Sequence, residues 1–220
     1  REHFNNNFNI TIEDTGCTPV RKIISKIKKI KPDYVGLSTL SCEAGLMHNL
    51  AIKIKELSPE TIIIVGGPHS LVSREELLQN YSIDIVVLGE AERTLIELLE
   101  KLENSEKLFG TKGIIFRNDS NIVNTETPDL IEDLDTLPFP AWDLVDIEKY
   151  SNFSNWNGSM KNDRYATMIT SRGCPYDCKF CHNIFGRKVR MRSPENVLEE
   201  IKYLNRKFGI KEIHIIDDIF

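Results

Sequence analysis

A chain of 220 residues is long enough for one or two domains, and its 40% hydrophobic and 28% charged residues exclude a disordered or fibrous protein. The net charge of −5 argues against a general nucleic-acid binder, because such proteins usually carry a basic excess. No stretch approaches the roughly 20 apolar residues that a membrane-spanning helix needs.

Short apolar segments alternate with amphipathic segments along the first half of the chain. We expect strands at residues 9–14, 34–40, 61–65 and 83–88, and helices at residues 19–31, 43–57, 74–80 and 90–102. Strands that are apolar on both faces, with helices between them, predict a doubly wound α/β sheet of flavodoxin-like type. The opening strand of such a sheet would lie before Arg1.

The pattern changes after a hairpin expected at residues 112–117 and 121–124. Residues 126–163 are rich in proline and acidic side chains, which predicts a linker docked through Leu137, Phe139 and Trp142. A strand, a cysteine-containing loop, a helix at residues 194–208 and a further strand follow. We therefore expect a first domain at residues 1–125 and a second that begins at 164 and runs to 220.

The five cysteines divide into two isolated residues and one cluster. Cys17 and Cys42 are isolated, whereas Cys174, Cys178 and Cys181 form a C-x3-C-x2-C pattern directly after a predicted strand. Three thiolates on one loop can hold three corners of an iron–sulfur cube and leave the fourth iron open. A zinc site is the alternative, but zinc usually takes a second ligand pair farther along the chain, which the sequence lacks.

This cysteine pattern resembles that of the radical S-adenosylmethionine (SAM) superfamily, with Phe180 at the aromatic position of C-x3-C-x-aromatic-C. The resemblance implies a [4Fe-4S] cluster on the three cysteines and SAM on the open iron, with reductive cleavage of SAM to a 5′-deoxyadenosyl radical. It also implies that Phe180 lies near the adenine and that Asp217 and Asp218 bind the SAM amino group. The alternatives are simple packing for Phe180 and a solvated acidic turn for the two aspartates.

A second resemblance lies in the first half of the chain. Ser38-x-Leu40, followed later by Gly66-Gly67, resembles the cobalamin-binding domain that precedes many radical SAM enzymes. Gly89-Glu90 resembles the GEGE loop of that domain. The resemblance implies that all six residues contact cobalamin, whereas the alternative is that any α/β sheet has small residues at its strand ends. His3 does not fit the cobalt-ligand motif, and His69 follows the glycine pair closely enough to line the same pocket.

The segment from Gly186 to Glu195 carries four cations within six residues. It is similar to the stretch that follows the cluster in the radical SAM family. Four cations so close together suggest RNA contact, but contacts within the fold are favoured because the chain is acidic overall.

Together these patterns identify the chain as a cobalamin-binding-type radical SAM enzyme, with the start of a (β/α) barrel after the first domain. We expect methyl transfer to an unknown small molecule, or its radical rearrangement or cyclisation, in the cytoplasm with an external electron donor such as flavodoxin or ferredoxin. An RNA methylthiotransferase and a non-catalytic iron–sulfur or metal module are the alternatives. A full barrel takes roughly 250 residues, so we expect an internal segment of a longer enzyme.

Overall fold

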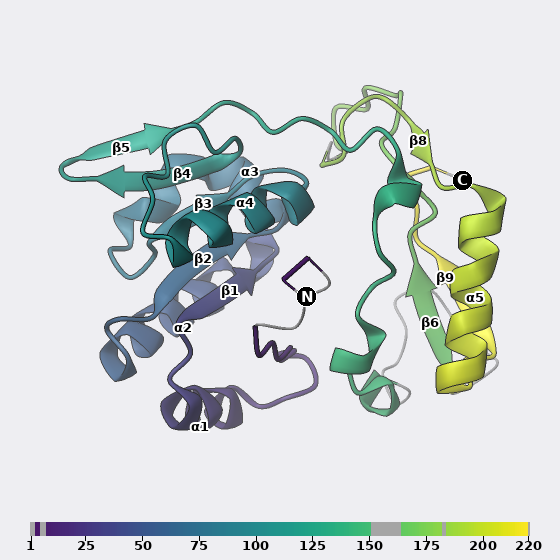
Figure 1. Ribbon diagram of the computed structural model, residues 1–220, viewed down its shortest axis with the longest axis horizontal. Coiled ribbons are helices and arrows are strands. Elements are labelled where there is room, and N and C mark those ends of the chain that lie inside the picture. Colours follow the sequence, from purple (N-terminus) through teal and green to yellow (C-terminus); the bar gives the residue numbers. More distant parts are fainter. Residues whose placement is uncertain (1–2, 5–7, 151–163, 182–183, 220) are drawn as a thin grey trace. The chain divides into compact units, whose positions relative to one another are not determined.

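The computed structural model describes residues 3–4, 8–150, 164–181 and 184–219 (Figure 1). These residues divide into two compact units. Val20–Leu130 form the first unit, and Arg1–Pro19 together with Ile131–Phe220 form the second. No helix in the described part of the chain is both long and apolar enough to cross a membrane.

The first unit is built on a five-stranded sheet in the order β1-β2-β3-β4-β5. The strands are β1 (Tyr34–Ser38), β2 (Ile62–Gly66), β3 (Ile85–Val87), β4 (Ile114–Asn118) and β5 (Asn121–Asn124). The first three strands are parallel, as predicted, and the last two form the predicted hairpin, which adds antiparallel pairing. The sheet is therefore mixed: β4 runs antiparallel to β3 after the connection through residues 91–103, and the short hairpin then adds β5 antiparallel to β4.

Helices cover both faces of this sheet, as expected for a doubly wound α/β fold (Figure 1). The helices are α1 (Val20–Ile30), α2 (Ala44–Leu57), α3 (Pro68–Ser73) and α4 (Ala91–Glu103). Ile54 of α2 packs on one face beside Ile63, and Leu98 of α4 packs on the other face beside Ile64. Neighbouring residues of β2 therefore point into opposite cores, which explains why the strand is apolar throughout.

Two expectations in the early part of the chain are wrong. Residues 9–14 do not form a strand, and Tyr150 instead holds this segment by donating from its hydroxyl to Asp14 Oδ2 at 2.9 Å. Burial raises the pKa of Tyr150 and the hydrogen bond to Asp14 raises it further. The helix expected at residues 74–80 is a 3-10 helix at Arg74–Gln79, preceded by α3, which the sequence analysis missed.

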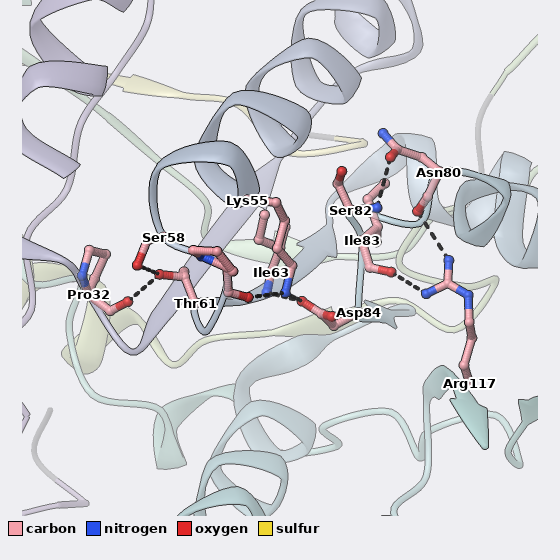
Figure 2. A network of polar contacts seen from close by, with 11 residues as sticks. Pro32, Lys55, Ser58, Thr61, Ile63, Asn80, Ser82, Ile83, Asp84 and Arg117 are labelled. Atoms are coloured by element: carbon pink, nitrogen blue, oxygen red, sulfur yellow. Dashed lines mark hydrogen bonds and ion pairs between the residues drawn. The ribbon is translucent and has the colours of Figure 1, made fainter. Parts of the chain in front are cut away.

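Side chains satisfy the backbone at the amino ends of the parallel strands (Figure 2). Asp84 accepts a hydrogen bond from Ile63 N at 2.7 Å and pairs with Lys55 at 2.8 Å. Arg117 donates to the carbonyl of Ile83 at 2.7 Å. Because buried backbone groups need partners, these contacts fix how the strands enter the sheet.

The described residues of the second unit form two small sheets and one long helix. Strands β6 (Tyr165–Met168) and β9 (Glu212–Ile215) are parallel, and β7 (Ser171–Arg172) and β8 (Arg190–Met191) are antiparallel. Helix α5 (Pro194–Phe208) connects β8 to β9 and packs Leu204 against Ala166 and Met168. The Ser193 hydroxyl accepts from Asn196 N at 3.1 Å and so caps the amino end of this helix.

The segment before β6 also packs on α5. Between residues 131 and 150 it forms three short 3-10 helices, at Leu134–Thr136, Trp142–Leu144 and Ile147–Tyr150. Trp142 Nε1 donates to Glu200 Oε1 at 3.0 Å, and the other oxygen of this buried carboxylate lies 2.6 Å from Arg192. The expected docking through Trp142 is therefore confirmed.

Candidate functional site

The candidate cluster loop leaves β7 through Gly173. This residue has a φ of +90°, and a Cβ placed on it would lie 2.3 Å from the carbonyl oxygen of Lys188. Cys174 N then donates to the carbonyl of Gly186 at 3.2 Å. Only glycine fits at position 173, because both its backbone angle and its close neighbour exclude a side chain. Gly173 and the hydrogen bond of Cys174 therefore fix where the loop begins.

The three cysteines of this loop are free thiols. Cys174 is half-buried, Cys178 and Cys181 are exposed, and Cys181 N donates to Cys178 O at 3.1 Å in a turn. Within the ranges that the structure describes, no three His, Cys, Asp or Glu side chains converge on a single-ion site. In an iron–sulfur cube each thiolate binds a different iron, so three thiols spread along one loop are a donor set that fits this group.

Phe180, at the aromatic position of the cysteine pattern, lies at the surface. The side chain of Phe180 is 94% exposed, so it contributes little to packing and presents its ring to solvent. His182, which directly follows Cys181, lies outside the described residues. The role of Phe180 near an adenine stays a prediction.

Asp217 and Asp218 follow β9 and bind the chain that leads into the cluster loop. Asp217 accepts from Thr170 N at 2.6 Å, from the Thr170 hydroxyl at 2.5 Å and from the Ser171 hydroxyl at 2.9 Å. Asp218 accepts from Gly173 N at 3.2 Å. The Asp217 carboxylate is therefore bound within the fold, whereas Asp218 is exposed, and the binding of SAM by either residue stays a prediction.

The cations of the segment after the loop have partners within the same unit. Arg187 pairs with Asp177, and Lys188 pairs with Glu132. Arg190 is buried and donates to the carbonyl of Ile131 at 2.8 Å. With Arg192 bound to the buried carboxylate of α5, the four cations make contacts within the fold, which is the interpretation that the sequence favoured.

In the first unit the structure brings three of the predicted cobalamin residues together. Ser38 is the register partner of Gly66 across β1 and β2. Gly67 follows with a φ of +86°, and a Cβ there would lie 2.7 Å from Ser38 Oγ and 2.9 Å from Thr39 N. A Cβ on Gly66 would meet nothing closer than 3.9 Å. Gly67 is therefore required by the fold, whereas Gly66 leaves space that the fold itself does not use.

The remaining predicted residues lie at the adjoining strand ends. Gly89 follows β3 with a φ of +67°, and a Cβ on it would lie 3.1 Å from Pro128. Glu90 is buried, and Leu40 is half exposed. The packing against Pro128 gives Gly89 a structural reason, so contact of this residue with a ligand stays a prediction.

Sequence reasoning missed Ser70, which joins two of these strand ends. Its hydroxyl lies 2.7 Å from the carbonyl oxygen of Gly67 and 2.8 Å from that of Val87. His69, noted for its place after the glycine pair, is buried with its ring nitrogens 3.1 Å from Ser41 Oγ and 3.4 Å from Ser73 Oγ. No local sequence pattern marks Ser70, because one of its two acceptors, the carbonyl oxygen of Val87, lies on another strand.

An open pocket of about 490 Å³ lies at the opposite, amino edge of the sheet, lined by Lys31–Tyr34 and Leu57–Ile62. It contains none of the predicted site residues. In doubly wound sheets, ligands bind beyond the carboxyl ends of the strands. We therefore assign the candidate site to the carboxyl edge.

Comparison with known families agrees with both motifs. Residues 4–99 match the family model described as B12 binding domain, and residues 168–218 match that of the radical SAM superfamily. The two matches cover the glycine-rich strand ends and the cysteine loop, respectively.

Individual proteins are similar to this chain over most of its length. An uncharacterised methyltransferase of Pyrococcus horikoshii is 32% identical over 94% of this chain and 44% of its own length. An anaerobic magnesium-protoporphyrin IX monomethyl ester cyclase of Synechocystis is 32% identical over 84% of this chain and 36% of its own. The solved structure of the cobalamin-dependent SAM radical enzyme OxsB, with aqua-cobalamin and SAM bound, has a TM-score of 0.74 at 26% identity, over 91% of this chain and 27% of that one. The chain thus spans less than half the length of these relatives.

Proposed function

Because the chain belongs to the radical SAM superfamily and carries a B12-binding domain ahead of its cysteine loop, we propose that it is part of a cobalamin-dependent radical SAM enzyme. Its reaction is methyl transfer to a small molecule, or radical rearrangement or cyclisation of that molecule. Relatives named as a methyltransferase and as a cyclase support both versions.

The observation that carries the proposal is the cysteine loop. Three free thiols occur in the C-x3-C-x2-C pattern, directly after a strand and beyond a glycine that no other residue can replace. Such a set offers three thiolates and leaves one iron of a cube open. An electron carrier with four protein ligands has no such open position.

When bound, the cluster supplies the electron that cleaves SAM, and cobalamin supplies a carrier for the methyl group. The chain's own residues bind and orient these groups. Cys174, Cys178 and Cys181 would hold the irons, and Phe180 would lie near the adenine. Asp217 and Asp218 would supply the carboxylate for the SAM ammonium group.

In the first unit, the small residues at the strand ends admit cobalamin close to the backbone. Ser38, Leu40, Gly66, Gly67, Gly89 and Glu90 would contact cobalamin at this edge. The free backbone surface at Gly66 supports this placement. The reducing partner in this proposal is a flavodoxin or ferredoxin, and the cytoplasm is the compartment in which such thiols stay reduced.

Anaerobic reconstitution of the full-length protein with iron and sulfide tests the radical assignment. Under reduction with SAM, the reconstituted protein should produce 5′-deoxyadenosine. Its repeated absence from a protein with an intact cluster would sink the radical assignment in favour of a non-catalytic module. Absorbance of bound cobalamin is measured separately, and failure to bind it removes the cobalamin assignment while the radical assignment stands. Sulfur insertion into RNA in place of methyl transfer would identify a methylthiotransferase.

A further inference from the structure

At the end of the β6–β9 pair, a side chain replaces the neighbouring strand as the hydrogen-bond acceptor for the backbone of Thr170. The last ladder bond of this pair runs from Ile216 N to Met168 O at 2.9 Å. Beyond it the two strands separate, and the amide of Thr170 turns to the carboxylate of Asp217. Because a backbone donor without a partner is costly, Asp217 replaces the missing strand at the point where the chain leaves the sheet.

The two adjacent aspartates differ in how much of each carboxylate is used. Both oxygens of Asp217 accept hydrogen bonds, one from an amide and one from two hydroxyls, and its side chain is half-buried. Asp218 is exposed and binds Gly173 N through one oxygen. A carboxylate offers about four acceptor positions. Asp217 uses most of its positions within the fold, whereas Asp218 keeps an oxygen that can accept from a cation.

We propose that Asp217 is a positioning residue that fixes the start of the cluster loop, and that of this pair only Asp218 is left to bind the ammonium group of SAM. The contacts of the pair extend over residues 170–173 and end immediately before Cys174. Asp217 therefore acts on the cluster through the backbone and touches neither iron nor SAM. This assignment rests on the proposed function for the identity of the bound groups.

Four variants of the full-length protein separate anchoring from ligand binding. Asp217→Ala removes every acceptor, whereas Asp217→Asn keeps an amide oxygen for Thr170 N and offers its NH₂ to hydroxyls that can accept. Thr170→Val removes one hydroxyl donor without touching the carboxylate. Asp218→Asn removes the charge that an ammonium would need and keeps an oxygen for Gly173 N.

The readouts are iron and sulfide bound after reconstitution, the electron paramagnetic resonance signal of the reduced cluster, and the change that added SAM causes in that signal. Asp217→Ala should weaken cluster retention by about tenfold or more, as expected when a group that orients metal ligands is lost. Asp217→Asn should stay near wild type. Thr170→Val should act in the same direction as Asp217→Ala, with non-additive effects in the double variant, because both remove one shared contact.

Asp218→Asn should keep the cluster and weaken SAM binding by about ten- to a hundredfold, the range for losing a charged hydrogen-bond partner. The proposal is overturned if Asp217→Ala retains a wild-type cluster signal but loses its response to SAM, because Asp217 would then be the SAM ligand. If Asp217→Ala does not fold by circular dichroism, Thr170→Val combined with Ser171→Ala decides, and unchanged cluster retention in that variant overturns the proposal. A wild-type protein that binds the cluster but makes no 5′-deoxyadenosine refutes the proposed function and leaves the anchoring test intact.

Discussion

At the carboxyl ends of β1 and β2 the chain places Ser38, Gly66 and Gly67, whereas beyond the carboxyl end of β9 it places two aspartates. In the first unit a Cβ on Gly66 would meet nothing closer than 3.9 Å, so the backbone there is bare. In the second unit the carboxylates of Asp217 and Asp218 are engaged with the chain that enters the cluster loop. One edge offers space, and the other offers fixed hydrogen-bond acceptors.

This difference matches the demands of the two groups that we propose. A large cofactor that lies along strand ends needs room, which glycine supplies by lacking a side chain. A cluster on a short loop needs its first ligand in a set place, which hydrogen bonds supply. The two edges should therefore fail differently: the first when an atom is added, and the second when a ligand or an acceptor is removed.

The largest effect is expected from removing a cluster ligand. Cys174→Ala leaves two thiolates for three irons, so the full-length protein should lose its iron–sulfur absorbance and its production of 5′-deoxyadenosine fall below detection. Cys42→Ala, at an exposed thiol in the first unit, is the matched control and should keep both. An intact cluster in Cys174→Ala would contradict the assignment of this ligand.

The next largest effect is expected at the glycine pair. Gly67→Ala should lower the free energy of unfolding by about 1–3 kcal/mol, because its φ of +86° strains an alanine and the new Cβ meets Ser38 Oγ. Gly66→Ala should change stability by no more than about 0.5 kcal/mol and yet weaken cobalamin binding. Urea unfolding and cobalamin absorbance measure the two effects. Equal stability of the two variants would show that Gly67 does not have the structural role argued above.

Periodicity and motif spacing predicted most of the first unit, because its strands and helices bury continuous apolar faces. Outside the first unit, these patterns failed at residues 9–14. There Ile10 and Ile12 alternate with polar residues as in a strand, but they remain 38% and 49% exposed. Alternation indicates a strand only when a neighbouring strand is there to pair. Helix α3 was missed although Pro68 at its start is a recognised signal.

The site was predicted in part. The residues that were found belong to local sequence motifs, whereas the contacts that were missed join residues far apart in the sequence. The cysteine loop and the glycine pair are local patterns and could be found by spacing. Asp217 was noticed through its place at a strand end, but its partners Thr170 and Ser171 lie 47 and 46 positions earlier, respectively. Ser70 likewise meets Val87 on another strand. Such contacts depend on how strands are paired, which no local pattern encodes.

A smaller effect is expected from a variant at the opposite, amino edge of the first sheet, which separates stability from cobalamin binding. Asp84→Ala removes the acceptor for Ile63 N and the partner of Lys55, and should cost about 1–2 kcal/mol of unfolding free energy. Cobalamin binding should not change, because this network lies at the amino ends of the strands (Figure 2). Loss of cobalamin at wild-type stability would contradict the assignment of the two edges.

The smallest effect is expected from His48, whose ring nitrogen Nδ1 lies 3.1 Å from Asn80 Nδ2. Burial lowers the pKa of His48, and the neighbouring His69 lowers it further. The unfolded chain therefore takes up this proton more readily than the folded chain, so stability should fall as the pH drops below about 6.5, the ordinary pKa of histidine. His48→Gln, which keeps an acceptor for Asn80, should reduce this pH dependence in urea unfolding. An unchanged dependence would show that His48 does not couple folding to protonation.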